Sequence, residues 1–384
     1  MAVVGAARNQ VTRKVVIVGP GKIGCGFLAP LFAQAGWDVV LAARTVATAG
    51  RIRRAGHFLA RTTPDAAPHR VRTGAVTVGT AAFDHAVATA DLVATAVGSD
   101  AIPALGEPLA RALASRGRPI DVWAVENADV AAALRTAVRA AAAREGRRLP
   151  AVGFAGAIAW AAVAHGDFKE PGRPEFVGDG CGRLQVDGRR LITPLPALPG
   201  VEATADYEGA LHAKRLVFGA GHALCAYLGA RRGHRFVHEA VADPEIGPLV
   251  REAVEAADRA LGGACDPDTV LERFANAALQ DPVRRVARDP LRKLSAHGPL
   301  VGAARIVQDA TGAVPSAFAA GIAAALRYDD PADDQAFLLT ELRASSGTTT
   351  VVRDVCGIAP GDPLHVAVAR RLREPTERPA PHAA

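Results

Sequence analysis

The segment from residue 14 to residue 45 constrains the fold of this chain more than any other. A β-branched run at 15–18 leads into glycines at positions 19, 21 and 24, which precede a helical pattern of apolar residues and a second apolar run at 39–41. In a G-x-G-x-x-G turn between strand and helix, the first glycine makes the tight turn and the second lets the backbone approach a pyrophosphate. The third packs the helix closely against the strand. The helix N-terminus adds a positive dipole end for the phosphates.

We therefore predict a dinucleotide site built from this turn and from the ends of neighbouring strands. Residues 91–97 and 120–125 have the pattern of buried strands, and the carboxyl ends of parallel strands line the ligand crevice of such sheets. The predicted cofactor-binding residues are Gly19, Gly21, Lys22, Ile23, Gly24, Arg44, Ala96, Val97 and Asn127. The alternative is a glycine-rich turn of the same shape that binds no ligand.

Composition and charge exclude several other classes of protein. The hydrophobic fraction of 49% is enough for real cores, but no window of 18 residues is apolar and uncharged, so we predict no membrane span. The first residues lack the apolar segment of a signal peptide. Five cysteines without a C-x-x-C pair fit a reducing cytoplasm and no zinc site. The net charge of +6 comes from arginines dispersed among acids, so we expect small anionic ligands and no nucleic-acid partner.

The order of strand and helix patterns predicts the domain organisation. Strands alternate with helices up to three prolines at 194–199, and the pattern beyond them is helical. We therefore predict an α/β Rossmann-type nucleotide-binding domain at 14–196, followed by an all-α domain at 197–373. A leader at 1–13 and a disordered Pro-rich tail at 374–384 complete the chain, which we expect to be a monomer or dimer.

Lysine is rare in this chain, which makes each lysine a candidate for chemistry. Only five are present, against forty arginines, and arginine cannot lose its proton in a protein whereas a buried lysine can. Lys214 lies eight residues before His222, which on a regular α-helix is about 80° of rotation and roughly 12 Å of rise. By itself the spacing also fits a solvated lysine and a core histidine.

Several motifs, taken together in order, resemble those of the polyol-specific long-chain dehydrogenases over nearly the whole length. They are GPGKIGCGF at 19–27, DLVATAVG at 91–98, VEN at 125–127, GHALCAYLG at 221–229, GH at 233–234, PLRKLSA at 290–296 and GIAAAL at 321–326. The chain is thereby identified as a divergent member of that family. The resemblance implies a metal-free, NAD(P)-dependent interconversion of a secondary alcohol and a ketone. The implied substrate is a sugar phosphate, a polyol phosphate or a related cyclitol, phosphorylated or not.

The resemblance also implies roles for individual residues. The family signature K-x-x-x-x-N-x-x-H matches Lys214 as the acid/base and His222 as the residue that orients the substrate. Asn127 matches an asparagine that donates to the reacting oxygen. The signature asparagine falls at Gly219, which either makes room for a different substrate group or a water, or marks weakened catalysis. Trp160 and Ala161 stand where the family has an Asp–Arg pair, which indicates a changed substrate. Two alternatives stay open, a cofactor-binding scaffold or sensor with weakened catalysis, and an epimerase that works by transient oxidation.

Two further predictions concern anionic groups of the ligands. Arg292 and Lys293, with Ser295 close by, are candidates for binding a substrate phosphate. The alternative is that they belong to a solvated helix end or to an interdomain salt bridge. The acid that binds the ribose 2′-hydroxyl in NAD-type sites falls at Ala43, which is followed by Arg44. This replacement predicts NADP(H) in preference to NAD(H), unless Arg44 only stacks on the adenine.

Overall fold

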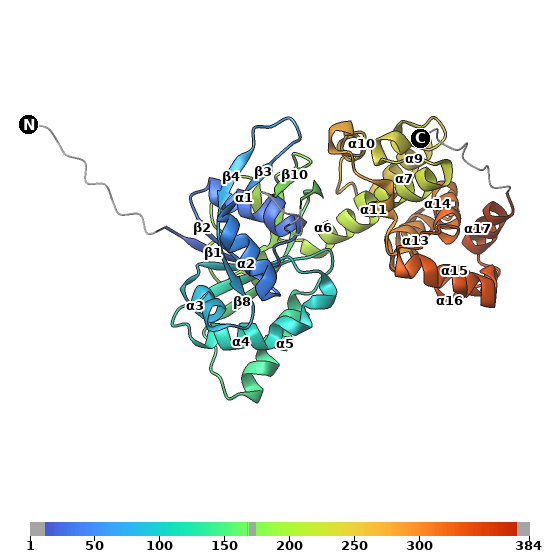
Figure 1. Cartoon of the computed structure of the whole chain (residues 1–384). Coiled ribbons are helices and arrows are strands. Elements are labelled where there is room, and N and C mark those ends of the chain that lie inside the picture. Colours follow the sequence, from blue (N-terminus) through green and yellow to red (C-terminus); the bar gives the residue numbers. More distant parts are fainter. Residues whose placement is uncertain (1–11, 167, 169–173, 375–384) are drawn as a thin grey trace, which may run out of the picture. The chain divides into compact units, whose positions relative to one another are not determined.

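The computed structural model describes residues 12–166, 168 and 174–374, and the chain divides into two compact units between Tyr207 and Glu208. Figure 1 shows strands and helices in the first unit and helices alone in the second. Most of the predicted leader (residues 1–11) and of the predicted tail (375–384) lies outside the described residues. The Pro-rich segment 194–199, where the sequence places the domain boundary, lies within the first unit because a strand of that unit's sheet follows it.

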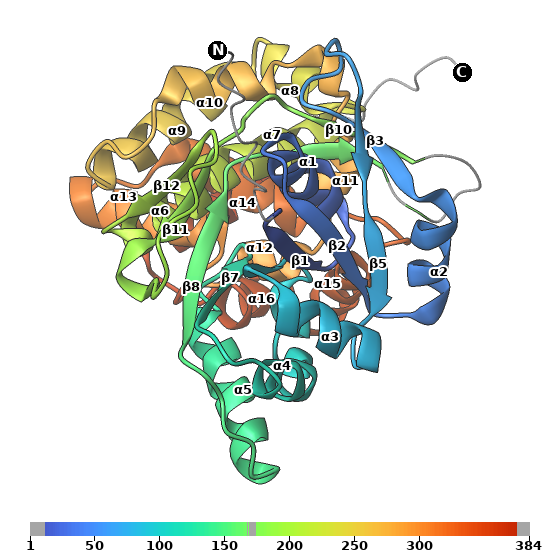
Figure 2. The ribbon, with the colours of Figure 1, turned by 90° about the vertical axis from the view of Figure 1, so that its left-hand side faces the viewer.

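The first unit is built on an eight-stranded sheet with the order β12-β11-β8-β7-β6-β1-β2-β5. Its strands are β1 (Lys14–Val18), β2 (Asp38–Ala43), β5 (Gly74–Thr77), β6 (Leu92–Thr95), β7 (Ile120–Val125), β8 (Val152–Ala159), β11 (Leu184–Asp187) and β12 (Val201–Thr204). The strands from β8 to β5 are parallel, and β11 runs antiparallel to β8. Figure 2 shows β8, β7, β1, β2 and β5 in this order across the sheet.

Helices cover both faces of this sheet, which explains why its central strands are apolar on both sides. Alternate residues such as Val16 and Val122 pack in one cluster with helices α3 (Ala81–Thr89), α4 (Gly106–Ala114) and α5 (Ala131–Arg144). Ile17 and Trp123 pack in another with α1 (Ala29–Gln34) and α2 (Val46–Ala55). The strand order reverses between β1 and β6, the point at which doubly wound sheets bind their ligands.

A second, four-stranded sheet has the order β4-β3-β10-β9. Its strands are β3 (His57–Arg61), β4 (His69–Arg72), β9 (Val163–His165) and β10 (Glu175–Gly178). The sequence predicts only a helix and a polar loop at 43–68, so β3 is an addition. It also predicts an edge strand pair at 71–78, but β4 and β5 belong to different sheets.

The second unit is helical in the part of it that the structure describes, and no helix there or in the rest of the described chain is both long and apolar enough to cross a membrane. Its helices are α6 (Tyr207–Ala213, which starts in the first unit), α7 (Gly219–Arg232), α8 (Val237–Ala242), α9 (Gly247–Ala260), α10 (Pro267–Phe274), α11 (Val283–Ala287), α12 (Pro290–Leu294), α13 (Pro299–Thr311), α14 (Ser316–Leu326), α15 (Asp334–Ser346), α16 (Thr348–Asp354) and α17 (Pro363–Arg373). The predicted fold class is confirmed.

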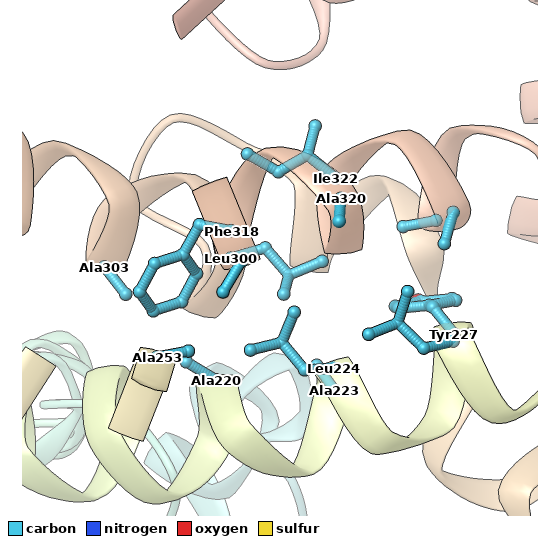
Figure 3. Close-up of a cluster of buried hydrophobic side chains, with 14 of the residues drawn as sticks. Ala220, Ala223, Leu224, Tyr227, Ala253, Leu300, Ala303, Phe318, Ala320 and Ile322 are labelled. Atoms are coloured by element: carbon cyan, nitrogen blue, oxygen red, sulfur yellow. The ribbon is translucent and has the colours of Figure 1, made fainter. Parts of the chain in front are cut away.

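Helix α7 is enclosed in the core of the second unit, since every residue from 220 to 229 except His222 is buried. Figure 3 shows Leu224 and Tyr227 of α7 turned toward α13 and α14, which contribute Leu300 and Phe318. All four side chains are buried. Burying one such side chain fully is worth about 1.5–3 kcal/mol, so this packing fixes the rotation of α7 about its own axis.

Candidate active site

The three glycines of the turn at 19–24 differ in what surrounds them. Gly19 has φ +105°, and a Cβ added there would lie 2.3 Å from the carbonyl oxygen of Ala96. A Cβ at Gly24 would lie 2.1 Å from the oxygen of Gly19. A Cβ at Gly21 would meet nothing within 4 Å, and this residue is exposed. The turn is thus closed by its first and third glycines and open at the second, which is the form that a bound diphosphate requires.

The helix after the turn is continuous from Lys22 to Gln34 but widens into a π turn at Gly24–Leu28. The N–H of Ala29 donates to the oxygen of Gly24, five residues back, and every residue of the π turn is buried. Single π turns inside α-helices occur frequently at functional sites. Lys22 and Ile23, both half-buried, form the first turn of this helix.

Glu126 fixes the segment that follows β6, next to the glycine turn. Its carboxylate accepts hydrogen bonds from the N–H groups of Val97 and Gly98, both at 2.9 Å, and from the hydroxyl of Thr95 at 3.4 Å. Burial raises the pKa of Glu126, and these hydrogen bonds offset part of that rise. The next residue, Asn127, is exposed. Sequence reasoning on single residues misses Glu126. Its position directly after a buried strand could have indicated a role at the ligand-binding edge of the sheet.

Arg44 follows β2 directly and is exposed, whereas Ala43 is buried. Thr45 caps α2 by accepting from the N–H of Thr48 at 3.2 Å, so the backbone after Arg44 is held in place. Arg53 donates to the oxygen of Ala75 at 3.3 Å and is thereby engaged with β5. Arg44 is thus an exposed cation directly after the position of the missing acid.

Lys214 and His222 lie on one continuous helix that contains a second π turn. The turn spans Lys214–Phe218, and the N–H of Gly219 donates to the oxygen of Lys214. The expected 80° between Lys214 and His222 assumes a regular α-helix and is therefore wrong. Because the wide turn absorbs one residue, eight residues advance the helix as seven would, about 20° short of two full turns. The two side chains consequently share a face, with a rise of about 10 Å.

His222 is held by a carboxylate and an aromatic ring. Its Nε2 lies 3.1 Å from Oδ2 of Asp281, and its ring stacks on Phe274 with centroids 5.2 Å apart. Burial lowers the pKa of His222 more than Asp281 raises it, so the ring is neutral near pH 7. A carboxylate can only accept, so we assign the proton to Nε2, which leaves Nδ1 as an acceptor.

Sequence reasoning misses Asp281, the carboxylate that binds His222. Arg285 donates to both of its oxygens, at 2.6 and 2.5 Å. Burial alone would raise the pKa of Asp281, but the hydrogen bonds from His222 and Arg285 outweigh it and hold the pKa well below its usual range. The i,i+4 spacing of Asp281 and Arg285 is a weak sequence signal, but their contact with His222 joins residues 59 positions apart.

The depressed pKa values of this cluster predict acid-sensitive stability. A group with a depressed folded pKa stabilises the fold above its unfolded pKa and loses that contribution as pH falls. We expect the free energy of unfolding to decline below about pH 6.5 through His222 and further below about pH 4 through Asp281. Asp281→Asn should lower the wild-type value by about 3 kcal/mol at pH 7 and flatten the second decline.

The measurement is denaturant unfolding of the full chain between pH 8 and pH 3. Asp354→Asn is the matched control, because its ion pair with Arg353 is more than half exposed and should contribute little. Equal pH slopes below pH 4 for the wild type and Asp281→Asn would contradict the assignment.

The structure does not join Arg292 and Lys293 into one clamp. Lys293 is buried, its amine donates to the oxygen of Arg288, and burial lowers its pKa to about 7. Arg292 is exposed and lies 3.8 Å from the carboxylate of Asp289. The hydroxyl of Ser295 donates to the oxygen of Arg292. The two cations therefore have different surroundings, although they are adjacent on α12.

The two positions that depart from the family pattern differ in how tightly the structure holds them. Gly219 has ordinary helical angles, and a Cβ there would lie 3.4 Å from the oxygen of Lys214, which is normal contact. Trp160 follows β8, donates its indole N–H to Gln185 at 2.7 Å, and has the guanidinium of Arg183 5.7 Å from its ring centroid. Nothing in the backbone requires glycine at position 219.

Metal ligands are not clustered in the described residues, where no group of three or more His, Cys, Asp or Glu could hold an ion. All five cysteines are free thiols.

Comparison with known proteins identifies the relatives of this chain. Residues 212–349 match the model of the mannitol dehydrogenase C-terminal domain. The mannitol-1-phosphate 5-dehydrogenase of Arthrobacter sp. (strain FB24) is 31% identical, covering 94% of this chain and 98% of that protein. The same enzyme of Bacillus licheniformis is also 31% identical, covering 92% and 98%.

Among solved structures, Pseudomonas fluorescens mannitol 2-dehydrogenase in a ternary complex with NAD and D-mannitol matches with a TM-score of 0.73 at 17% identity. The match covers 94% of this chain and 92% of that one. This likeness shows a common fold. The sequence identity to the two mannitol-1-phosphate 5-dehydrogenases extends over nearly the full length of both compared chains and shows common descent. The chain belongs to the mannitol dehydrogenase family of polyol-specific, nicotinamide-dependent dehydrogenases, as a divergent member.

Proposed function

We propose that this chain interconverts a secondary alcohol and a ketone on a sugar-like substrate, with Lys214 as the acid/base and no metal ion. The observation that carries the proposal is the π turn that begins at Lys214, because it aligns this lysine with the neutral His222 on one helix face. The open glycine turn supports the binding of a dinucleotide, since Gly21 leaves the backbone accessible.

The chemistry divides between the cofactor and the residues of the chain. When bound, a nicotinamide dinucleotide would supply the acceptor of hydride from the alcohol carbon, or the donor of hydride to the ketone. In the oxidative direction Lys214, in its neutral form, takes the hydroxyl proton, and in the reductive direction its ammonium protonates the forming alkoxide. Asn127 donates an amide N–H to the reacting oxygen, and Nδ1 of His222 accepts from a neighbouring substrate hydroxyl.

The substrate we propose is a sugar phosphate, a polyol phosphate or a related cyclitol. The curated relatives named above act on a phosphorylated polyol. Gly219 and Trp160 remove hydrogen-bonding groups that the family offers to hydroxyls, so we propose a substrate other than mannitol 1-phosphate. Arg292 remains a candidate for a phosphate because it is exposed.

A panel assay tests this function directly. The protein is incubated with NADPH or NADH and a set of ketose phosphates, their dephosphorylated analogues and cyclic ketones, and the loss of cofactor absorbance is followed. Turnover on any of them supports the proposal. Cofactor binding without turnover on all of them would favour the scaffold or sensor, and epimer formation without net cofactor change would favour an epimerase.

We also propose a preference for NADP(H). Arg44 stands exposed next to the position where an NAD-type site has its acid, and a guanidinium attracts a 2′-phosphate that a carboxylate would repel. NADPH should bind at least about tenfold more tightly than NADH, which is about 1.4 kcal/mol. Arg44→Ala should erase most of this difference in a fluorescence titration.

Arg54→Ala is the matched control for Arg44, since it removes another exposed arginine from the adjoining helix. It should leave the ratio of the two affinities unchanged. Tighter binding of NADH than of NADPH by the wild-type protein would refute the preference.

A further inference from the structure

Two buried carboxylates on or beside β7 bond in the same way at opposite ends of the strand. Glu126, directly after the carboxyl end, accepts from two successive backbone N–H groups and a threonine hydroxyl. Asp121, near the amino end, accepts from the N–H groups of Ile192 and Thr193, both at 3.0 Å, and from the hydroxyl of Thr193. They differ in what they hold, because only Glu126 faces the edge of the sheet that carries the glycine turn.

The segment held by Glu126 forms one wall of that turn. The N–H of Ala96 donates to the oxygen of Val18 at 2.8 Å, and the oxygen of Ala96 occupies the space that a Cβ at Gly19 would need. Val97 and Gly98 follow at once, and Gly98 has φ +88°. A shift of this segment would therefore change the space beside the first glycine.

An ionised carboxylate is the group that suits this position. Glu126 is 7% exposed, and burying a charge is costly unless hydrogen bonds compensate. A glutamine has one acceptor oxygen, so its NH2 group would face one of the two N–H donors and leave it unsatisfied. The chain therefore has glutamate at position 126, although burying its charge is less favourable than burying a glutamine, because only the carboxylate can accept from the N–H groups of both Val97 and Gly98.

We infer that Glu126 is a positioning residue for the dinucleotide: by binding the N–H groups of Val97 and Gly98, it sets the 96–98 segment against the glycine turn in the arrangement that accepts the cofactor. The inference rests on the proposed function, since it requires that unit 1 binds a nicotinamide dinucleotide. Glu126 touches the protein backbone and acts on the cofactor through the 96–98 segment.

The test compares Glu126→Gln with Asp121→Asn in the full chain. Both changes remove one acceptor from an equivalent network on the same strand, so both should lower the unfolding midpoint. Only Glu126→Gln should weaken the binding of NADPH, by about tenfold or more in the dissociation constant measured by fluorescence titration. Glu126→Ala, which removes both acceptors, should weaken it further.

The outcomes separate this inference from the function it rests on. If the wild-type protein binds neither NADPH nor NADH, both the proposed function and the role of Glu126 are refuted. If the wild type binds and Glu126→Gln binds equally well, or if Asp121→Asn weakens binding as much, only the role of Glu126 falls. Should Glu126→Gln not fold, hydrogen exchange on the wild type decides: NADPH must slow exchange at residues 97–98 and not at 192–193, and equal slowing would overturn the inference.

Discussion

Lys214→Ala is expected to slow the chemical step by about 10²–10⁴ while the affinity for the cofactor stays nearly unchanged. In the proposed function Lys214 exchanges the proton of the reacting hydroxyl, and it belongs to the second unit, whereas the glycine turn belongs to the first. Single-turnover kinetics with saturating cofactor measure the step, and fluorescence titration measures the affinity. Added primary amines should restore part of the rate of the variant.

Lys14→Ala is the control for this experiment. Lys14 lies at the start of β1, where its ammonium is 3.9 Å from the carboxylate of Asp38 on the neighbouring strand. Removing it should change the single-turnover rate by less than about twofold, since a partly exposed ion pair contributes little. Normal turnover by Lys214→Ala would exclude the lysine from proton transfer.

Gly219→Asn is expected to raise the rate on mannitol 1-phosphate or its ketose counterpart by about 10²–10³, the usual effect of one donor to a reacting oxygen. The backbone at this position is helical, and a Cβ meets only ordinary contacts with Lys214 and Pro299, so the side chain can be accommodated. Asparagine is also a slightly better helix former than glycine, so the variant should be at least as stable.

Gly219→Ala separates the donor from the added volume. It fills part of the same space without an amide and should leave the rate on mannitol 1-phosphate unchanged. On the natural substrate, both variants should lose activity if Gly219 makes room for a substrate group. Equal effects of Asn and Ala on mannitol 1-phosphate would show that position 219 does not act through a hydrogen bond.

The parts of the site that sequence predicts are those whose causes are local. The glycine turn is determined by three residues within six positions and by the strand before them. The structure has the expected tight turn at Gly19 and the expected open backbone at Gly21, whereas a Cβ at Gly24 would first meet the oxygen of Gly19 within the turn. The position of Asn127 after β7 follows equally from a short buried run. Such features depend on backbone conformation and on immediate neighbours.

The parts that sequence does not predict depend on packing between distant segments. The contact of His222 with Asp281 joins residues far apart in the chain, as does that of Glu126 with Val97. The burial of Lys293 depends on the helices around it. The adjacent Arg292 and Lys293 therefore predict an exposed phosphate site from sequence, although the fold buries the lysine. The segment KRLVF at 214–218 has no residue that distinguishes a π turn from an α-helix.

The π turn at Lys214–Phe218 makes the alignment of Lys214 with His222 depend on how the helix is wound as well as on which residues it contains. Such a turn holds one residue more than the regular helix, so relaxing it to uniform α-helix at constant length would rotate Lys214 by about 100° away from the face of His222. Deleting one residue between 215 and 218 would restore uniform winding and keep the two side chains on one face, since seven regular positions also end about 20° short of two full turns. A homologue one residue shorter here, without a π turn, would therefore present the same pair in the same direction.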